Sequence, residues 1–207
     1  MKFLFIGNSH TFRNDMPHIF QMICEKNGID AQVTMLAHGG KTLAFHQAEP
    51  EVRFNILYGN YDYIILQDRQ KDFSPDGALE AGTAIDQFIQ QTPSKKMLYM
   101  PWTVPQEKML QAQVAGGYYR LGRAIHASVA PVGLLWWEYM DRHPGENLFM
   151  DDNRHATPKG STLAAYTIYQ TIFGEPAVIL KPEDSDITAL VNARIKEYVS
   201  EQYIASL

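Results

Sequence analysis

The sequence has few cysteines, no cluster of basic residues and no long apolar run, and each of these absences excludes a class of protein or site. It contains one cysteine, Cys24, in 207 residues, which excludes an internal disulfide and a metal site built from several cysteines. Lysine and arginine number 18 against 23 aspartate and glutamate and form no cluster, so the chain presents no basic stretch for a nucleic acid. No apolar run approaches the length of a membrane span. We therefore expect neither a nucleic-acid nor a membrane partner, and we expect Cys24, in its apolar stretch, to be a buried, inert thiol.

What remains is an ordinary globular composition, with 45% hydrophobic and 20% charged residues. The length suits one α/β domain, which we predict over residues 1–207. The first apolar run, residues 3–7, ends in a glycine and is too short for a signal-peptide core. We interpret it as a first strand and expect a cytoplasmic protein.

Short apolar runs recur along the chain at nearly even spacing. Their starting points lie 30, 30, 34 and 35 residues apart, and the runs are Phe3–Ile6, Val33–Leu36, Tyr63–Leu66, Met97–Met100 and Val132–Trp136. This interval suits repeated βαβ units, and continuous rather than alternating apolar residues are typical of strands covered on both faces. The pattern predicts a three-layer α/β/α sandwich around a five-stranded parallel sheet of the flavodoxin-like type.

Helical periodicity fills the stretches between these runs. Asn14 or Asp15 can begin a helix after the first strand, with Pro17 in its first turns. Asp184 or Ser185 can begin the last helix. Two apolar stripes at helical spacing are expected to face the sheet or its neighbouring helices: Val114, Tyr118, Leu121 and Ile125, and then Ile187, Leu190, Val191, Ile195, Tyr198 and Val199.

Ligands of such folds sit at the carboxyl ends of the strands, so we expect the functional residues directly after each run. Ser9 follows the first run on a tight turn, where its hydroxyl and N–H can face a ligand, although a serine there can also be a plain helix cap. Gly39 and Gly40 follow the second run and allow a close backbone approach, or form an ordinary turn. Gln67 follows the third run, as an oxyanion donor or as a tie for its loop.

The segment before the last long helix holds an acid and a histidine three residues apart. Thr157 is a natural N-cap and Pro158 a natural first helical residue, which places His155 just before a helix with Asp152 upstream. A short loop of this kind can bring the carboxylate onto one imidazole nitrogen and leave the other free to take a proton from a serine.

Together these features resemble the SGNH (GDSL-like) hydrolase superfamily. Gly7-Asn8-Ser9 matches its first block, Gly39 or Gly40 its second, and Asp152-Asn153-Arg154-His155 its last, and the likeness runs from about residue 2 to about residue 173. The third block departs from the family, because Gln67-Asp68 stands where Gly-x-Asn-Asp is usual.

The resemblance implies hydrolysis of a short-chain acyl ester, acetyl being one candidate, on a small molecule or a carbohydrate and without a cofactor. Ser9 is then the nucleophile, His155 its base and Asp152 the residue that orients His155, with Asp151 as a competitor. The N–H groups of Ser9 and of Gly39 or Gly40, with the amide of Gln67, would form the oxyanion hole.

Two other functions are compatible with the sequence. His10, His38 and His155, with Asp151 or Asp152, lie on the same predicted rim and offer ligands for zinc in a metal-dependent hydrolase. A carbohydrate-binding domain without activity is also possible on this fold.

Aromatic residues follow the last two predicted strands. Trp102 comes after the fourth run, and we expect it, with His10, to line the substrate site. Trp136 and Trp137 end the fifth, where at least one of them is expected in the core. The remaining histidines are interpreted as structural: His18, His46, His126 and His143.

Overall fold

A computed structural model describes residues 1–206. At its centre is a five-stranded parallel sheet in the order β2-β1-β3-β4-β5, which confirms the predicted flavodoxin-like arrangement. The strands are β1 (Lys2–Gly7), β2 (Gln32–Ala37), β3 (Tyr63–Leu66), β4 (Lys95–Tyr99) and β5 (Ser128–Ala130).

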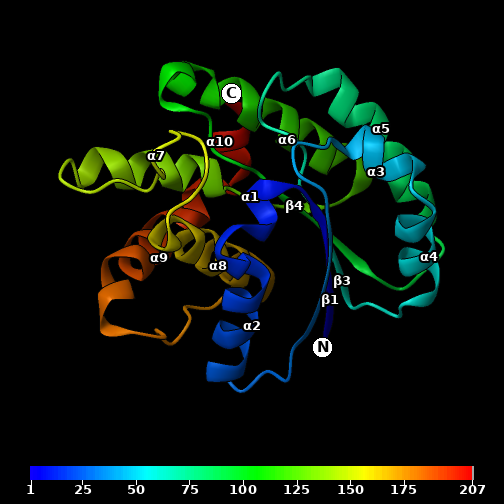
Figure 1. Cartoon of the computed structure of the whole chain (residues 1–207), viewed down its shortest axis with the longest axis horizontal. Coiled ribbons are helices and arrows are strands. Elements are labelled where there is room, and N and C mark those ends of the chain that lie inside the picture. The colour runs from blue at the N-terminus through cyan, green and yellow to red at the C-terminus, as the bar shows by residue number, and fades with distance from the viewer. Residues whose placement is uncertain (207) are drawn as a thin grey trace.

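Helices cover both faces of the sheet (Figure 1). They are α1 (Ser9–Phe12), α2 (Met16–Lys26), α3 (Leu43–Ala48), α4 (Pro50–Tyr58), α5 (Pro75–Ile89), α6 (Gln111–Ile125), α7 (Val132–Arg142), α8 (Pro158–Phe173), α9 (Ser185–Tyr198) and α10 (Glu201–Ala205). Three 3₁₀ turns connect them: η1 (Arg13–Asp15), η2 (Pro105–Leu110) and η3 (Pro182–Asp184). None of the helices in residues 1–206 has the length and apolar character that crossing a membrane requires.

Alternation along the strands divides the core into two layers. Phe3 and Phe5 of β1 pack with α2, α7, α8 and α9, whereas Leu4 and Ile6 pack with α3, α4, α5 and α6. All four side chains are fully buried. β1 is paired with β2 on one side and β3 on the other, so its carboxyl end lies between the ends of two neighbouring strands.

The predicted fifth strand is wrong. Residues 132–136 form the first turns of α7, and the strand that joins β4 is the three-residue β5 just upstream. Val132, Leu135 and Trp136 are fully buried in this helix. A short, continuously apolar run does not distinguish a buried helix from a buried strand, because both are covered on all sides.

Most of the predictions about helices are confirmed. All four residues of the first stripe are buried on α6, and Thr157 caps α8 through its hydroxyl, with Pro158 at the first position. On α9 the second stripe is buried as far as Tyr198, but Val199 follows the helix and is 41% exposed. Cys24 is fully buried on α2, and burial raises the pKa of its thiol to about 12, as an inert thiol requires.

Candidate active site

Ser9 lies on the tight turn where β1 ends. It is the first residue of α1, so its N–H has no partner within the helix. Asn8 caps this helix by accepting a hydrogen bond from the N–H of His10 at 3.1 Å. Gly7 leaves no room for a side chain, because a Cβ there would lie 2.3 Å from Oγ1 of Thr11. Gly7 and Asn8 thus produce a tight turn at the end of β1 that exposes Ser9.

The turn after β2 lies beside Ser9. Asn8 donates from Nδ2 to the carbonyl of Lys41 at 2.9 Å, which ties the two loops together. Gly40 has a φ of +69°, a left-handed conformation that suits glycine. Within residues 1–206 the N–H groups of Ser9, Gly39 and Gly40 form no hydrogen bond to the protein. Three backbone donors are therefore free at one edge of the sheet.

His155 is held by a short loop just before α8. Oδ1 of Asp152 accepts hydrogen bonds from the N–H groups of Arg154 at 3.0 Å and His155 at 2.9 Å. The N–H of Met150 donates to the carbonyl of His155 at 2.8 Å, and an isolated bridge joins Phe149 to Ala156. These contacts fix the backbone, and with it the direction of the imidazole.

The three predicted catalytic side chains lie in one hydrogen-bonded row. Nε2 of His155 is 2.9 Å from Oγ of Ser9, and Nδ1 is 2.5 Å from Oδ2 of Asp152. Slight burial opposes ionisation of Asp152, but hydrogen bonds from the ring and backbone of His155 outweigh it and hold the pKa of the carboxyl well below its usual range. Asp151 is exposed and forms no hydrogen bond to any described residue, so Asp152 is the carboxylate placed against His155.

Gln67 is not placed as an oxyanion donor. It is fully buried, and its Oε1 accepts hydrogen bonds from the N–H of Asn8 at 3.0 Å and from Oγ1 of Thr11 at 2.9 Å. Its Nε2 donates to the carbonyl of Asp68. The amide is therefore committed to holding the Ser9 turn from behind, which is the alternative that the sequence left open.

Gln70 is the glutamine of this loop that lines the cleft. Its side chain lines the cleft with Ser9, Gly39 and Gly40, and its Nε2 donates to Oε2 of Glu107 at 2.8 Å. One N–H of the Gln70 carboxamide is therefore used in the bond to Glu107, which fixes the side chain. The second N–H of the same nitrogen is not needed for that bond. The sequence analysis predicted Gln67 and not Gln70 for this position, which is wrong, because the direction of the loop after Leu66 sets which glutamine lies at the cleft.

His10 lines the cleft as predicted, but Trp102 does not. Trp102 is 1% exposed, stacks on Trp136 at 3.8 Å between ring centroids, and donates from Nε1 to the carbonyl of Arg154 at 2.9 Å. It packs behind His10, with 4.7 Å between the rings. Burial, together with the nearby His155 and Arg154, lowers the pKa of His10 to about 3, so His10 is neutral.

The predicted zinc ligands are not brought together. Nε2 of His38 is 3.0 Å from Glu51, and both nitrogens of His155 are engaged by Ser9 and Asp152. The group of potential ligands that does converge in residues 1–206 is His143, Glu146 and Asp186, where Lys159 already pairs with both carboxylates.

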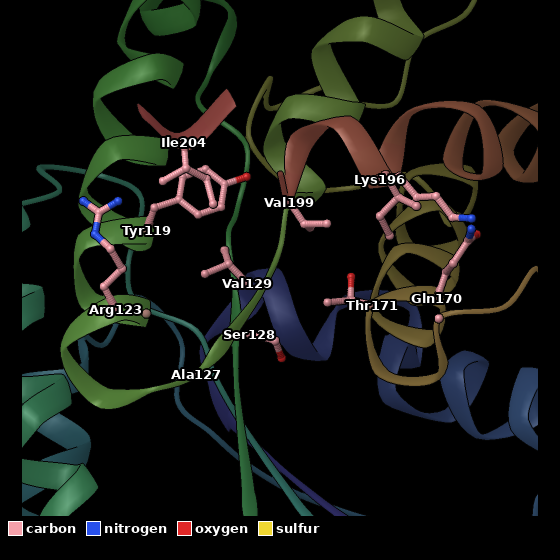
Figure 2. Close-up of a pocket in the computed structure, with 13 residues that line it drawn as sticks. Tyr119, Arg123, Ala127, Ser128, Val129, Gln170, Thr171, Lys196, Val199 and Ile204 are labelled. Atoms are coloured by element: carbon pink, nitrogen blue, oxygen red, sulfur yellow. The ribbon is translucent and has the colours of Figure 1, made fainter. Parts of the chain in front are cut away.

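The candidate catalytic residues open into a cleft of about 400 Å³. A second cavity, of about 440 Å³, lies beside β5 between α6, α8, α9 and α10 (Figure 2). Of the residues singled out from the sequence, its lining contains Ile195 and Val199, both from the predicted apolar stripe near the end of the chain. Tyr119, Val129 and Ile204 form apolar walls of this second cavity. Its lining residues do not include a row of acid, base and hydroxyl like the one at the cleft.

Comparison with solved structures identifies the fold. A candidate SGNH hydrolase from Slackia heliotrinireducens aligns over 83% of this chain and 98% of its own, with 20% identity and a TM-score of 0.69. A DUF4886 family protein from Bacteroides uniformis aligns over 100% and 99%, with 14% identity and a TM-score of 0.75. The psychrotrophic esterase EstA from Pseudoalteromonas sp. aligns over 83% and 96%, with 13% identity and a TM-score of 0.62.

The chain therefore has the fold of the SGNH hydrolases. No protein-family model matches its sequence. The curated proteins likewise include no match.

Proposed function

We propose that this protein is a serine esterase that cleaves short-chain acyl esters through an acyl-enzyme on Ser9. The observation that carries the proposal is the row in which Ser9, His155 and Asp152 are joined through both imidazole nitrogens. This is the arrangement that activates a serine hydroxyl, because the base can accept the hydroxyl proton while the carboxylate stabilises the resulting imidazolium.

In the proposed reaction, Oγ of Ser9 attacks the ester carbonyl as His155 takes its proton. The proton then passes to the departing alcohol, and the acyl group stays on Ser9. Asp152 remains ionised throughout, in accord with its depressed pKa. A water molecule, deprotonated by His155, releases the acid and restores Ser9.

The oxyanion of each tetrahedral intermediate needs donors that are already in place. We assign this role to the N–H groups of Ser9 and of Gly39 or Gly40, which are free and line the cleft with Ser9. Gln70 is the third donor in this proposal, in place of Gln67, because Gln70 lines the cleft and its bond to Glu107 uses only one of its two amide N–H groups. A neutral amide adds a hydrogen bond without introducing charge beside His155.

The acyl group is proposed to be short, acetyl included, and a carbohydrate remains a candidate for the alcohol. With Trp102 buried, Phe12 is the aromatic side chain in the cleft lining against which a sugar ring could pack. The neighbouring esterase EstA has a structure described as inhibited by monoethylphosphonate, which supports the use of phosphonates as probes here.

The function is tested by hydrolysis of p-nitrophenyl esters of increasing chain length, and then of acetylated sugars. The proposal predicts turnover that is highest with the shortest acyl groups and unaffected by EDTA. Ser9→Ala serves as the control for background hydrolysis. A wild-type protein no more active than this control on any ester would contradict the proposal, and loss of turnover in EDTA would reassign the chemistry to a metal.

A further inference from the structure

The cleft has a charge unlike that of the chain as a whole. Four of its 12 lining residues are cationic and none is acidic, although the net charge of the protein is −5. The cations come from three separate segments: Arg13 from η1, Arg69 and Lys71 from the loop after β3, and Arg154 from the loop that carries His155. They converge only in the folded chain, so no cluster appears in the sequence.

Most of these charges have no partner in the protein. Arg13, Lys71 and Arg154 form no ion pair with any residue in the described range 1–206. Arg69 lies 3.9 Å from Asp72, and its Nε and Nη1 donate to the carbonyls of Lys71 and Gly40.

Elsewhere in residues 1–206 some arginines pair with carboxylates, whereas Arg53 and Arg123 form no ion pair. Arg120 bonds Asp76, and Arg194 bonds both Glu138 and Glu197. No carboxylate is among the residues that line the cleft, and Asp152 and Glu107 bond to two of those lining residues, His155 and Gln70. The three unpaired cations at the cleft therefore face solvent or a ligand rather than protein.

We infer that the substrate of this site is an ester that carries a negatively charged group, a carboxylate or phosphate, beside the bond that is cleaved. This inference rests on the proposed esterase function and adds the class of substrate. Arginine binds such oxyanions through paired N–H donors, and a hollow lined by one sign of charge raises the local concentration of the opposite sign. A neutral acyl ester gives these cations nothing to bind.

The test compares pairs of esters of similar size, one anionic and one neutral. For the acyl side, p-nitrophenyl hemisuccinate is compared with p-nitrophenyl butyrate, which has a methyl group in place of the carboxylate. For the alcohol side, p-acetoxybenzoate is compared with p-tolyl acetate. The quantity measured is the ratio of kcat/KM for the anionic ester to that for its neutral partner. We expect a ratio of about 10 or more in at least one pair, and the pair that shows it identifies the side that carries the charge.

Variants attribute the preference to particular residues. Arg13→Gln and Arg154→Gln remove side chains that have no partner in the protein, and each should lower the ratio by about threefold, the double variant by about tenfold. Arg123→Gln is the matched control, because Arg123 is also exposed and without an ion pair but lines the other cavity. It should leave the ratio unchanged. Raising the salt concentration from about 0.05 M to about 0.5 M should lower the wild-type ratio by screening.

The outcomes separate the two claims. Hydrolysis of the neutral esters with ratios near 1 in both pairs would overturn the anionic substrate and leave the esterase standing. An anionic preference that Arg13→Gln and Arg154→Gln retain, in proteins with wild-type melting temperatures, would overturn the assignment to these cations. If wild type exceeds Ser9→Ala on none of the four esters, the proposed function and this inference are both wrong.

Discussion

The cleft and the cavity beside β5 are similar in size and opposite in character. The cavity of Figure 2 is slightly the larger, about 440 Å³ against about 400 Å³. Its walls are mostly apolar, formed by residues such as Val129, Ile195 and Ile204. The cleft joins a serine, a histidine and a carboxylate in one row and has free backbone N–H groups beside them.

The difference shows that chemistry, rather than volume, distinguishes a candidate active site here. The cleft lies at the carboxyl end of β1, where loops from four parts of the chain meet, as parallel α/β sheets favour. The cavity lies against the short edge strand β5 and the last two helices. The substitutions proposed next test whether changes at the cleft affect hydrolysis and changes at the cavity do not.

The largest effect is expected from the nucleophile. Ser9→Ala should reduce kcat by about 10⁴–10⁶, because no acyl-enzyme can form. Ser9 is half-buried, and within residues 1–206 its hydroxyl forms a hydrogen bond to His155 alone, so the melting temperature should stay within a few degrees of wild type. Steady-state kinetics on p-nitrophenyl acetate, with thermal unfolding as the control, measure both. A variant that keeps a tenth of the wild-type activity would exclude Ser9.

The two adjacent aspartates provide a matched pair for the next effect. Asp152→Asn should lower kcat by about 10²–10⁴, since the amide cannot hold the same tautomer of His155. The lower bound reflects the exposure of the Asp152 side chain, 47%, which lets water substitute in part. Asp151→Asn should stay within about twofold of wild type because Asp151 is exposed and forms no hydrogen bond to any residue in 1–206. The opposite ranking would reassign the carboxylate.

The two glutamines after β3 should separate catalysis from stability. Gln70→Ala should lower kcat by about 10² with little change in KM, as loss of an oxyanion donor does. Gln67→Ala should instead destabilise the fold by about 2–4 kcal/mol, because the N–H of Asn8 and the hydroxyl of Thr11 lose their buried acceptor. Denaturant unfolding and kinetics on both variants decide it. A Gln70→Ala enzyme with wild-type kcat would remove Gln70 from the oxyanion hole.

The smallest effect belongs to the other cavity. Val199→Phe adds a bulky side chain to its lining and should leave kcat/KM for p-nitrophenyl acetate within about twofold. A loss of tenfold or more, with an unchanged melting temperature, would connect the two regions and break the contrast between them.

The sequence predicted that Ser9, His155 and Asp152 meet, but it did not predict the fifth strand of the sheet correctly. The positions of Ser9 and of the Asp152–His155 loop can be predicted from the sequence because turn and cap residues beside them fix the local geometry. These residues are Gly7 and Asn8 before Ser9, and Thr157 after His155. Parallel topology then brings such loops to one edge. The row joining residues 146 positions apart follows from these local rules.

The failures have a different origin. β5 is only three residues long, so the longer apolar run of α7 that follows it gives the stronger strand pattern in the sequence. Gln67 and Trp102 were expected at the site, yet both are buried, and their direction depends on packing with Thr11 and Trp136 respectively. Sequence spacing says where the backbone emerges but not which way each side chain turns.

The central claim is that Ser9 is a nucleophile activated by His155, and covalent labelling tests it most directly. The protein is incubated with a fluorophosphonate, digested, and the modified residue located by mass spectrometry. The account predicts a single phosphonyl adduct on the peptide that carries Ser9, with labelling lost in Ser9→Ala and strongly slowed in His155→Ala. Labelling of wild type elsewhere, or none at Ser9 under conditions in which a known serine esterase is fully modified, would contradict it.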